Sequence, residues 1–260
     1  MLVSEEVSQE INKKAVVLTP NSNQGVKKLE IVKPPDVICF LIGGAGDKKP
    51  YGGTGPNGNI VDVQRRITSD LAKEVNERRL KTVYLGYYEV YKPDRISTFV
   101  LSKINSKKSS IYIVGHSLGG WNGAHLSRIL SNYGYDVRML ITLDPVGEGF
   151  IVERVSDIYS DEPSPKAKYW VNLRYHQNSF SVIGRGLNPF RKHDRVTDVV
   201  PNWVADFGEQ WNPLLHNQPD IYEVVDVNHS LTVQAMDVKL TLGQSAWEIF
   251  KKSVQERLGE

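Results

Sequence analysis

Short segments rich in apolar and β-branched residues recur along this chain, and loops or segments of helical periodicity separate them. Such segments, when they lack polar alternation, are typical of strands buried on both faces of a sheet. The expected strands cover residues 36–42, 82–88, 110–114, 137–143 and 168–175. Because strands and helices alternate, the sequence predicts an α/β fold with a mostly parallel central sheet and helices on both faces.

Four other segments have the apolar periodicity of helices. In the first, which starts near Ile60, an apolar residue recurs every four positions from Val63 to Val75. The remaining helices are expected at residues 96–104, 118–133 and 245–258, and the one at 118–133 ends before Gly134, a residue suited to a helix C-terminus. Two further strands are expected, a short one at residues 15–19 and a late one that ends at His229.

Length and composition favour one domain over two. A chain of 260 residues, of which 40% are hydrophobic, can bury a sizeable single core. Residues 177–217 depart from the pattern, because periodicity fails there and glycine, proline, asparagine and tryptophan are frequent. Irregular segments of this length are commonly functional. We therefore expect one domain over residues 1–260, with a flap or cap-like segment at about 177–217.

Charge and cysteine content exclude several classes of protein. The net charge of +2 is spread over 32 basic and 30 acidic residues, which does not indicate a nucleic-acid partner. The one cysteine, Cys39, lies in an apolar strand segment and is expected to be a buried thiol. The N-terminal residues lack the apolar stretch of a secretory signal peptide, and no apolar segment is long enough to cross a bilayer. The sequence predicts a cytoplasmic protein, or one exported by a signal-peptide-independent route, with any membrane contact peripheral.

The stretch "GHSLG", residues 115–119, follows the expected strand at 110–114 and opens the expected helix at 118–133. At such a sharp turn a serine oxygen is presented as a nucleophile, and the flanking Gly115 and Gly119 avoid collisions. The N-terminus of the following helix favours the negative charge that forms during attack. Ser117 is therefore the predicted nucleophile, and the alternative is a serine in a structural turn. His116 is expected to pack on the opposite side of the turn.

A nucleophilic serine requires a base and an acid, and in this architecture they follow later strands in the order Ser, acid, His. Asp144 follows the strand at 137–143, and Pro145 stiffens the turn, so Asp144 is the predicted acid. The other interpretation of Asp144 is an aspartate that only starts a turn. Asp198, in "RVTDVVPNW", is the reserve acid, because this segment resembles the acid-bearing segment of fungal class 3 lipases.

His229 is the predicted general base. It follows the late strand and precedes the final helical segments, where a loop can reach the serine. His193 is the reserve. The remaining histidines are expected to be structural, with His125 packed on the helix after the nucleophile and His176 and His216 on the surface.

The oxyanion that forms on attack needs two backbone N–H donors. One is expected from Leu118, directly after the nucleophile. The other is expected in the glycine loop "GGAGD" after the strand at 36–42, with Ala45 as the first choice and Gly44 as the second. Alternatively these glycines serve the turn alone or cradle a phosphate, although the chain lacks the Gly-Lys-Ser or Gly-Lys-Thr of a phosphate-binding loop.

Together, "ICFLIGGAG", "IVGHSLGGWNGAHL", "LITLDPVG" and "VNHS" resemble the lipase-type α/β-hydrolase superfamily, and they occur in the same order. "GHSLGG" is similar to many triacylglycerol lipases and phospholipases, and "LDP" looks like the acid segment of the pancreatic-type lipases. The resemblance implies an α/β-hydrolase fold and a serine carboxylic ester hydrolase that forms an acyl-enzyme. The expected substrate is then an acyl ester with an apolar chain, such as a lipid, and no metal ion or organic cofactor is implied.

Other functions fit the same residues. A thioesterase or an acyltransferase uses the same triad, and leaderless lipases of this size also occur among secreted antibacterial phospholipase effectors of bacteria. A catalytically inactive, hydrolase-like binding protein is the alternative from a different class. Aromatic residues of the irregular segment are expected either to contact acyl chains or to fill space under a long loop; they are Phe180, Phe190, Trp203, Phe207 and Trp211.

Overall fold

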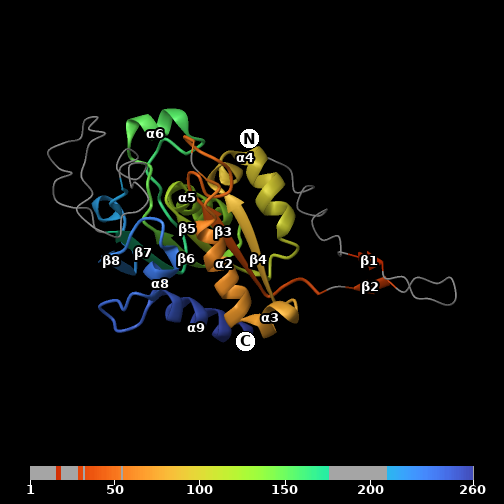
Figure 1. Cartoon of the computed structure of the whole chain (residues 1–260). Helices are drawn as coiled ribbons and strands as arrows, with labels where there is room; N and C mark the ends of the chain where they lie inside the picture. The colour runs from red at the N-terminus through yellow and green to blue at the C-terminus, as the bar shows by residue number, and fades with distance from the viewer. Residues whose placement is uncertain (1–15, 19–28, 32, 54, 176–209, 260) are drawn as a thin grey trace.

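The structure, a computed structural model, describes residues 16–18, 29–31, 33–53, 55–175 and 210–259 (Figure 1). Six strands form one sheet in the order β4-β3-β5-β6-β7-β8, and every neighbouring pair is parallel. They are β3 (Val37–Gly43), β4 (Leu80–Gly86), β5 (Ser110–His116), β6 (Asp136–Leu143), β7 (Tyr169–Tyr175) and β8 (Ile221–Val225). The predicted α/β class is confirmed.

Alternate residues of the central strands pack into two separate cores, one on each face of the sheet. In β3, for example, Cys39 and Leu41 belong to one core, and Phe40 and Ile42 belong to the other. The first core is covered by α2 (Asn59–Asp70), α8 (Thr232–Asp237) and α9 (Ala246–Gly259). The second is covered by η1 (Tyr87–Val90), η2 (Ile96–Val100) and α5 (Leu118–Asn132). Helices therefore lie on both faces, as predicted, and Cys39 is fully buried.

Several elements differ from the sequence-based expectation. The helix expected from Ile60 to Val75 is interrupted at Leu71, whose φ of −120° ends α2 before α3 (Ala72–Asn76) begins. The helix expected at 96–104 is a succession of α4 (Pro93–Arg95), η2 and η3 (Leu101–Lys103), which have α, π and 3₁₀ geometry. The strand expected to end at His229 ends at Val225, so His229 lies in the loop that follows β8.

A small antiparallel ladder lies outside the main sheet. It pairs β1 (Val16–Leu18), which was expected, with β2 (Leu29–Ile31), which was not. The short helices that were not expected include α6 (Phe150–Val155), η5 (Pro213–Leu215) and η1, which takes the place of the last residues of the strand expected at 82–88. Among the described residues, no helix is both long and apolar enough to cross a bilayer.

The carboxyl ends of all six strands meet at one edge of the sheet, because the strands are parallel. In Figure 1 the arrow of β4 points toward this edge. The loops that leave β3, β5, β6 and β8 at this edge carry Gly44, Ser117, Asp144 and His229. Open parallel sheets commonly bind ligands at this edge.

Candidate active site

Ser117 occupies a sharp turn between β5 and α5. Its backbone has φ 56° and ψ −128°, a conformation that non-glycine residues rarely adopt. A Cβ atom on Gly115 would lie 2.4 Å from the Gly119 carbonyl oxygen, and one on Gly119 would lie 2.2 Å from the Ile42 carbonyl oxygen. Both neighbours are backbone atoms that cannot rotate away. The turn therefore requires glycine on each side of Ser117, as the sequence predicts.

Backbone hydrogen bonds join this turn to the segment that carries Asp144. The Ser117 N–H donates to the Leu143 carbonyl over 3.0 Å, and the Val146 N–H donates to the Ser117 carbonyl over 3.2 Å. Asp144 lies between these two partners in the sequence and has a left-handed φ of 45°. The positions of the serine and the aspartate are thus fixed relative to each other by the main chain.

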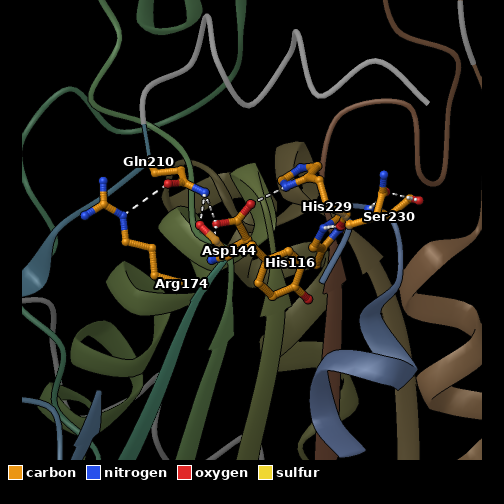
Figure 2. A network of polar contacts seen from close by, with 8 residues as sticks. His116, Asp144, Arg174, Gln210, His229 and Ser230 are labelled. Carbon is orange, nitrogen blue, oxygen red and sulfur yellow. Dashed lines mark hydrogen bonds and ion pairs between the residues drawn. The ribbon is translucent and has the colours of Figure 1, made fainter. Parts of the chain in front are cut away.

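The carboxylate of Asp144 contacts His229. His229 Nδ1 lies 2.5 Å from Asp144 Oδ2 and donates to it, while the Tyr175 N–H donates to Asp144 Oδ1 over 2.9 Å (Figure 2). Asp144 is 1% exposed, so these donors replace the water that its charge would otherwise attract. The structure therefore brings the predicted acid and the predicted base together, and Nδ1 of His229 carries the proton in this arrangement.

Gln210 is a further partner of the acid. Its Nε2 donates to Asp144 Oδ1 and, over 3.0 Å, to the Tyr175 carbonyl. Arg174 Nε in turn donates to Gln210 Oε1 over 3.1 Å, which orients the amide (Figure 2). Sequence reasoning did not identify Gln210, because it lies at the end of an irregular segment and belongs to no motif. An isolated bridge from Gln210 to Val146 brings it to the acid.

Two aromatic rings flank His229. The Tyr175 ring centroid lies 6.3 Å from that of His229 with the planes at 69°, and the His116 centroid lies 4.6 Å away with the planes at 43°. His116 Nε2 also lies 2.6 Å from the His229 carbonyl oxygen. His116 is therefore not the base, in line with the expectation, but it does more than pack, because its side chain faces the loop that carries His229 (Figure 2).

The Ser117 hydroxyl is buried and has no hydrogen-bond partner within the described part of the chain. The structure thus joins Asp144 to His229 but does not join His229 to Ser117. Contacts between a catalytic base and its nucleophile are often loose in the free enzyme and tighten when substrate binds. Other bonds connect the serine to the Asp144–His229 pair. His116, directly before Ser117, bonds the His229 carbonyl, and the Ser117 backbone bonds the residues on either side of Asp144 and Pro145.

The glycine loop after β3 lies directly against the serine. A Cβ atom on Gly44 would lie 2.6 Å from Ser117 Cβ, so only glycine allows this approach. Leu118 is the first residue of α5, where backbone N–H groups have no partner within the helix. These positions are compatible with an oxyanion site made by Leu118 and the loop. The assignment of the second N–H donor to Ala45, with Gly44 as the second choice, stays a prediction.

Asp47 holds the glycine loop in place. Its carboxylate accepts a hydrogen bond from the Tyr84 hydroxyl over 2.7 Å and from the Ile60 N–H, near the start of α2, over 3.1 Å. Asp47 is 1% exposed, and burial raises the pKa of its carboxyl above the ordinary value. Its side chain also lies against Gly43, where an added Cβ would meet it at 2.5 Å. The loop is therefore anchored to both β4 and α2.

A cavity of about 420 Å³ opens beside the glycine loop, and Gly44 lines both the cavity and the surroundings of Ser117. Its wall combines four aromatic rings with four charged side chains. Two of these are paired, because Arg95 donates to Asp157 over 2.7 Å. The lining consists of Gly44, Lys49, Pro50, Tyr51, Tyr87, Tyr88, Glu89, Arg95, Phe99 and Asp157.

Of the other residues singled out in the sequence, three lie in the described part of the chain. His125 is buried on α5 and His216 is exposed beside Glu162, both as expected. Trp211 is fully buried and stacks on Trp170 with centroids 5.4 Å apart, so it fills the core and does not offer a surface to acyl chains. The reserve acid, the reserve base and the other members of the irregular segment lie outside the described residues; they are Asp198, His193, His176, Phe180, Phe190, Trp203 and Phe207.

Among the described residues, no group of three or more His, Cys, Asp or Glu side chains is arranged to hold a metal ion. Comparison with known proteins found no match to this chain among protein-family models, curated proteins or solved structures. The geometry of Ser117, Asp144 and His229 is therefore the basis on which a function can be argued.

Proposed function

We propose that this protein is a serine hydrolase that cleaves carboxylic esters through an acyl-enzyme. The observation that carries the proposal is the 2.5 Å contact between His229 Nδ1 and the buried Asp144 carboxylate, next to a serine held in a strained turn. An acid that orients a histidine beside such a serine is the arrangement of a catalytic triad. If Ser117 served only to form a turn, the hydrogen-bonded pair of Asp144 and His229 would have no explanation.

The topology supports an α/β-hydrolase fold for this chain. Ser117, Asp144 and His229 follow β5, β6 and β8, so the nucleophile, acid and base occur along the chain in the order typical of that fold. The helix after the nucleophile packs closely on the turn that follows β6, since a Cβ on Gly120 would lie 3.0 Å from Pro145 Cβ. Both features agree with the resemblance found in the sequence.

In the first half of the proposed reaction, Ser117 Oγ attacks the ester carbonyl carbon while His229 Nε2 accepts its proton. Asp144 keeps the proton on Nδ1 and stabilises the imidazolium that forms. The carbonyl oxygen becomes an oxyanion, and the N–H groups of Leu118 and of Ala45 or Gly44 stabilise its charge. The tetrahedral intermediate then collapses, the C–O bond to the alcohol breaks, and His229 donates its proton to the leaving alkoxide.

The second half of the reaction returns the enzyme to its starting state. Water attacks the acyl-enzyme carbonyl, and His229 accepts a proton from it. A second oxyanion forms in the same site. When the bond to Ser117 Oγ breaks, His229 returns the proton to the serine and the carboxylic acid leaves.

The proposed substrates are acyl esters, with lipids among them, and the cavity beside Gly44 is the proposed place for part of the substrate. Its four aromatic rings suit apolar or flat groups, because Tyr and Phe offer large apolar surfaces, and its charged side chains suit a polar part of the same substrate. Gly44 links this wall to Ser117, so a group held in the cavity has its ester within reach of the nucleophile. Peripheral contact with a membrane surface remains a prediction.

Labelling with a fluorophosphonate probe tests whether Ser117 is an active nucleophile. We expect the native protein to be labelled and Ser117→Ala to lose the label. Ser127→Ala is the matched control, because Ser127 is also buried on α5 but its hydroxyl donates to the Ala124 carbonyl. A native protein that is never labelled would refute the proposed enzyme.

Hydrolysis of a short-chain aryl ester tests the acid. We expect Asp144→Asn to lower kcat about 10⁴-fold, because the amide can no longer stabilise the imidazolium and favours the wrong tautomer. The same substitution at Asp198 is expected to leave kcat near the native value. Full activity of Asp144→Asn together with loss of activity of Asp198→Asn would reassign the acid to Asp198.

A further inference from the structure

His116 makes a contact that the proposed chemistry does not use. It is the last residue of β5, directly before the proposed nucleophile, and it is 2% exposed. Its Nε2 lies 2.6 Å from the His229 carbonyl oxygen. A carbonyl oxygen can only accept, so Nε2 of His116 donates and carries the ring proton.

The environment of His116 favours the neutral ring. Burial, followed by the neighbouring His229, lowers the pKa of His116 well below the ordinary histidine value. The proton on Nε2 leaves Nδ1 as an unprotonated nitrogen, and Nδ1 has no hydrogen-bond partner among the described residues. An apolar side chain would fill this buried site without leaving a polar atom unpaired. The hydrogen bond to His229 explains why a histidine occupies this buried position, whereas packing alone would not require one.

His229 is thereby held at two different points. Asp144 Oδ2 binds its ring at Nδ1, and His116 binds its main chain at the carbonyl. The loop around it has an internal turn, in which the Ser230 N–H and hydroxyl both donate to Asn228 Oδ1, at 3.0 and 2.8 Å. That turn shapes the loop but does not attach it to β5. The bond from His116 does.

We propose that His116 is a positioning residue for the general base: its Nε2–H fixes the main chain of His229 relative to the turn that carries Ser117. This inference rests on the proposed function of Ser117 and His229. His116 and Ser117 are adjacent in sequence, so the bond ties the position of the base to the position of the nucleophile. The geometry supplies a connection where no direct hydrogen bond joins Ser117 to His229 in the structure.

Two substitutions separate positioning from packing. In His116→Gln the side-chain amide nitrogen can take the place of Nε2 as a donor, whereas His116→Met fills similar space without a donor. We expect His116→Met to lower kcat for a short-chain aryl ester about tenfold, with KM little changed, as for loss of one buried hydrogen bond. His116→Gln is expected to recover most of that loss. Equal kcat values for the two variants would overturn the proposal.

His125→Met is the matched control. His125, on α5, is also a buried histidine, and its Nε2 also bonds a carbonyl oxygen, that of Asp161, over 2.9 Å. The substitution removes the same kind of hydrogen bond far from His229. It is expected to lower the melting temperature while leaving kcat near the native value. If it lowers kcat as much as His116→Met, the effect is one of stability and the proposal fails.

A readout independent of activity is the ¹⁵N spectrum of the histidine rings in the native protein. We expect His116 to be protonated at Nε2 and neutral at pH 7, and the Nδ1–H signal of His229 to persist in His116→Gln. A His116 ring protonated at Nδ1 would overturn the proposal even if His116→Met does not fold. Failure of the proposed function is distinguishable, because the native protein would then show neither labelling nor hydrolysis.

Discussion

The turn that carries Ser117 and the loops that carry Asp144 and His229 are held by different kinds of interaction. The turn is fixed by steric contacts of backbone on backbone, within the turn between Gly115 and Gly119 and across to the end of β3 between Gly119 and Ile42. The acid and the base are fixed by hydrogen bonds between segments far apart in the sequence, from β5 to the loop after β8. The nucleophile is thus placed mainly by close backbone packing, while its partners are placed by hydrogen bonds between side chains and distant segments.

This difference separates the two ways in which the site can fail. A change that adds atoms to the turn must move backbone, so it affects the stability of the whole sheet. A change that removes one hydrogen bond from the acid or the base leaves the packing intact and alters mainly the catalytic geometry. Substitutions of the two kinds should therefore separate effects on folding from effects on activity.

The largest effect on stability is expected from Gly119→Ala. The new Cβ would lie 2.2 Å from the Ile42 carbonyl oxygen, which cannot yield without moving β3, so we expect a loss of about 3 kcal/mol in the free energy of unfolding. Gly123→Ala is the control on the same helix, because the nearest atoms to its Cβ are side-chain atoms of Ile42 and Ile113 at 3.3 and 3.4 Å, and the nearest backbone atom lies at 3.9 Å. Chemical denaturation measures both. Equal stability of the two variants would show that the turn is not sterically fixed.

A smaller effect on stability but a clear loss of activity is expected from Gln210→Leu. The variant removes one donor to the Asp144 carboxylate, and a hydrogen bond to a charged group contributes enough for kcat to fall roughly 10- to 100-fold. Steady-state kinetics together with denaturation measures this. Gln64→Leu is the control, because Gln64 donates to Thr82 over 3.0 Å on α2, away from the site. Native kcat in Gln210→Leu would mean that the Tyr175 N–H and His229 position the acid without Gln210.

The smallest effect is expected in the pH dependence of stability. The pKa of His116 is lowered in the folded protein by burial and then by His229, whereas the unfolded chain binds a proton near the ordinary value of about 6.5. Below that pH the unfolded state holds more protons, so the free energy of unfolding falls as pH falls, by at most about 1.4 kcal/mol per pH unit for this group. In His116→Gln that contribution is absent, and denaturation curves between pH 7 and about pH 5 should show a shallower decline. An unchanged decline would mean that His116 is protonated in the folded state.

The sequence predicted the elements whose cause is local. The strand at 110–114, the turn at Ser117 and the glycines around it follow from apolar run length and from steric exclusion, and the structure places all of them as expected. Asp144 was also predictable, because it directly follows an apolar strand. The fold class followed from the alternation of strand and helix patterns.

The features that the sequence did not predict depend on long-range contacts. Gln210 reaches Asp144 through a bridge between segments more than sixty residues apart, and no local pattern marks such a pairing. The side chain of His116 faces His229 because the end of β5 lies beside the loop after β8. Its position next to Ser117 in the sequence predicted only that it packs. Trp211 was ambiguous for the same reason, since its burial depends on Trp170 and Trp121 from other elements.

The position of His229 after β8 has a consequence for how the protein loses activity. Within the described part of the chain, β8 lies at an edge of the sheet with β7 as its one neighbour, whereas β5 lies inside the sheet between β3 and β6. Edge strands open in local fluctuations more often than central ones, so their amide hydrogens exchange faster. We expect the amides of β8 to exchange before those of β5, and mild denaturant to release the base while Ser117 remains in its folded turn. Activity would then report the integrity of one edge of the sheet, and would disappear while most of the fold persists.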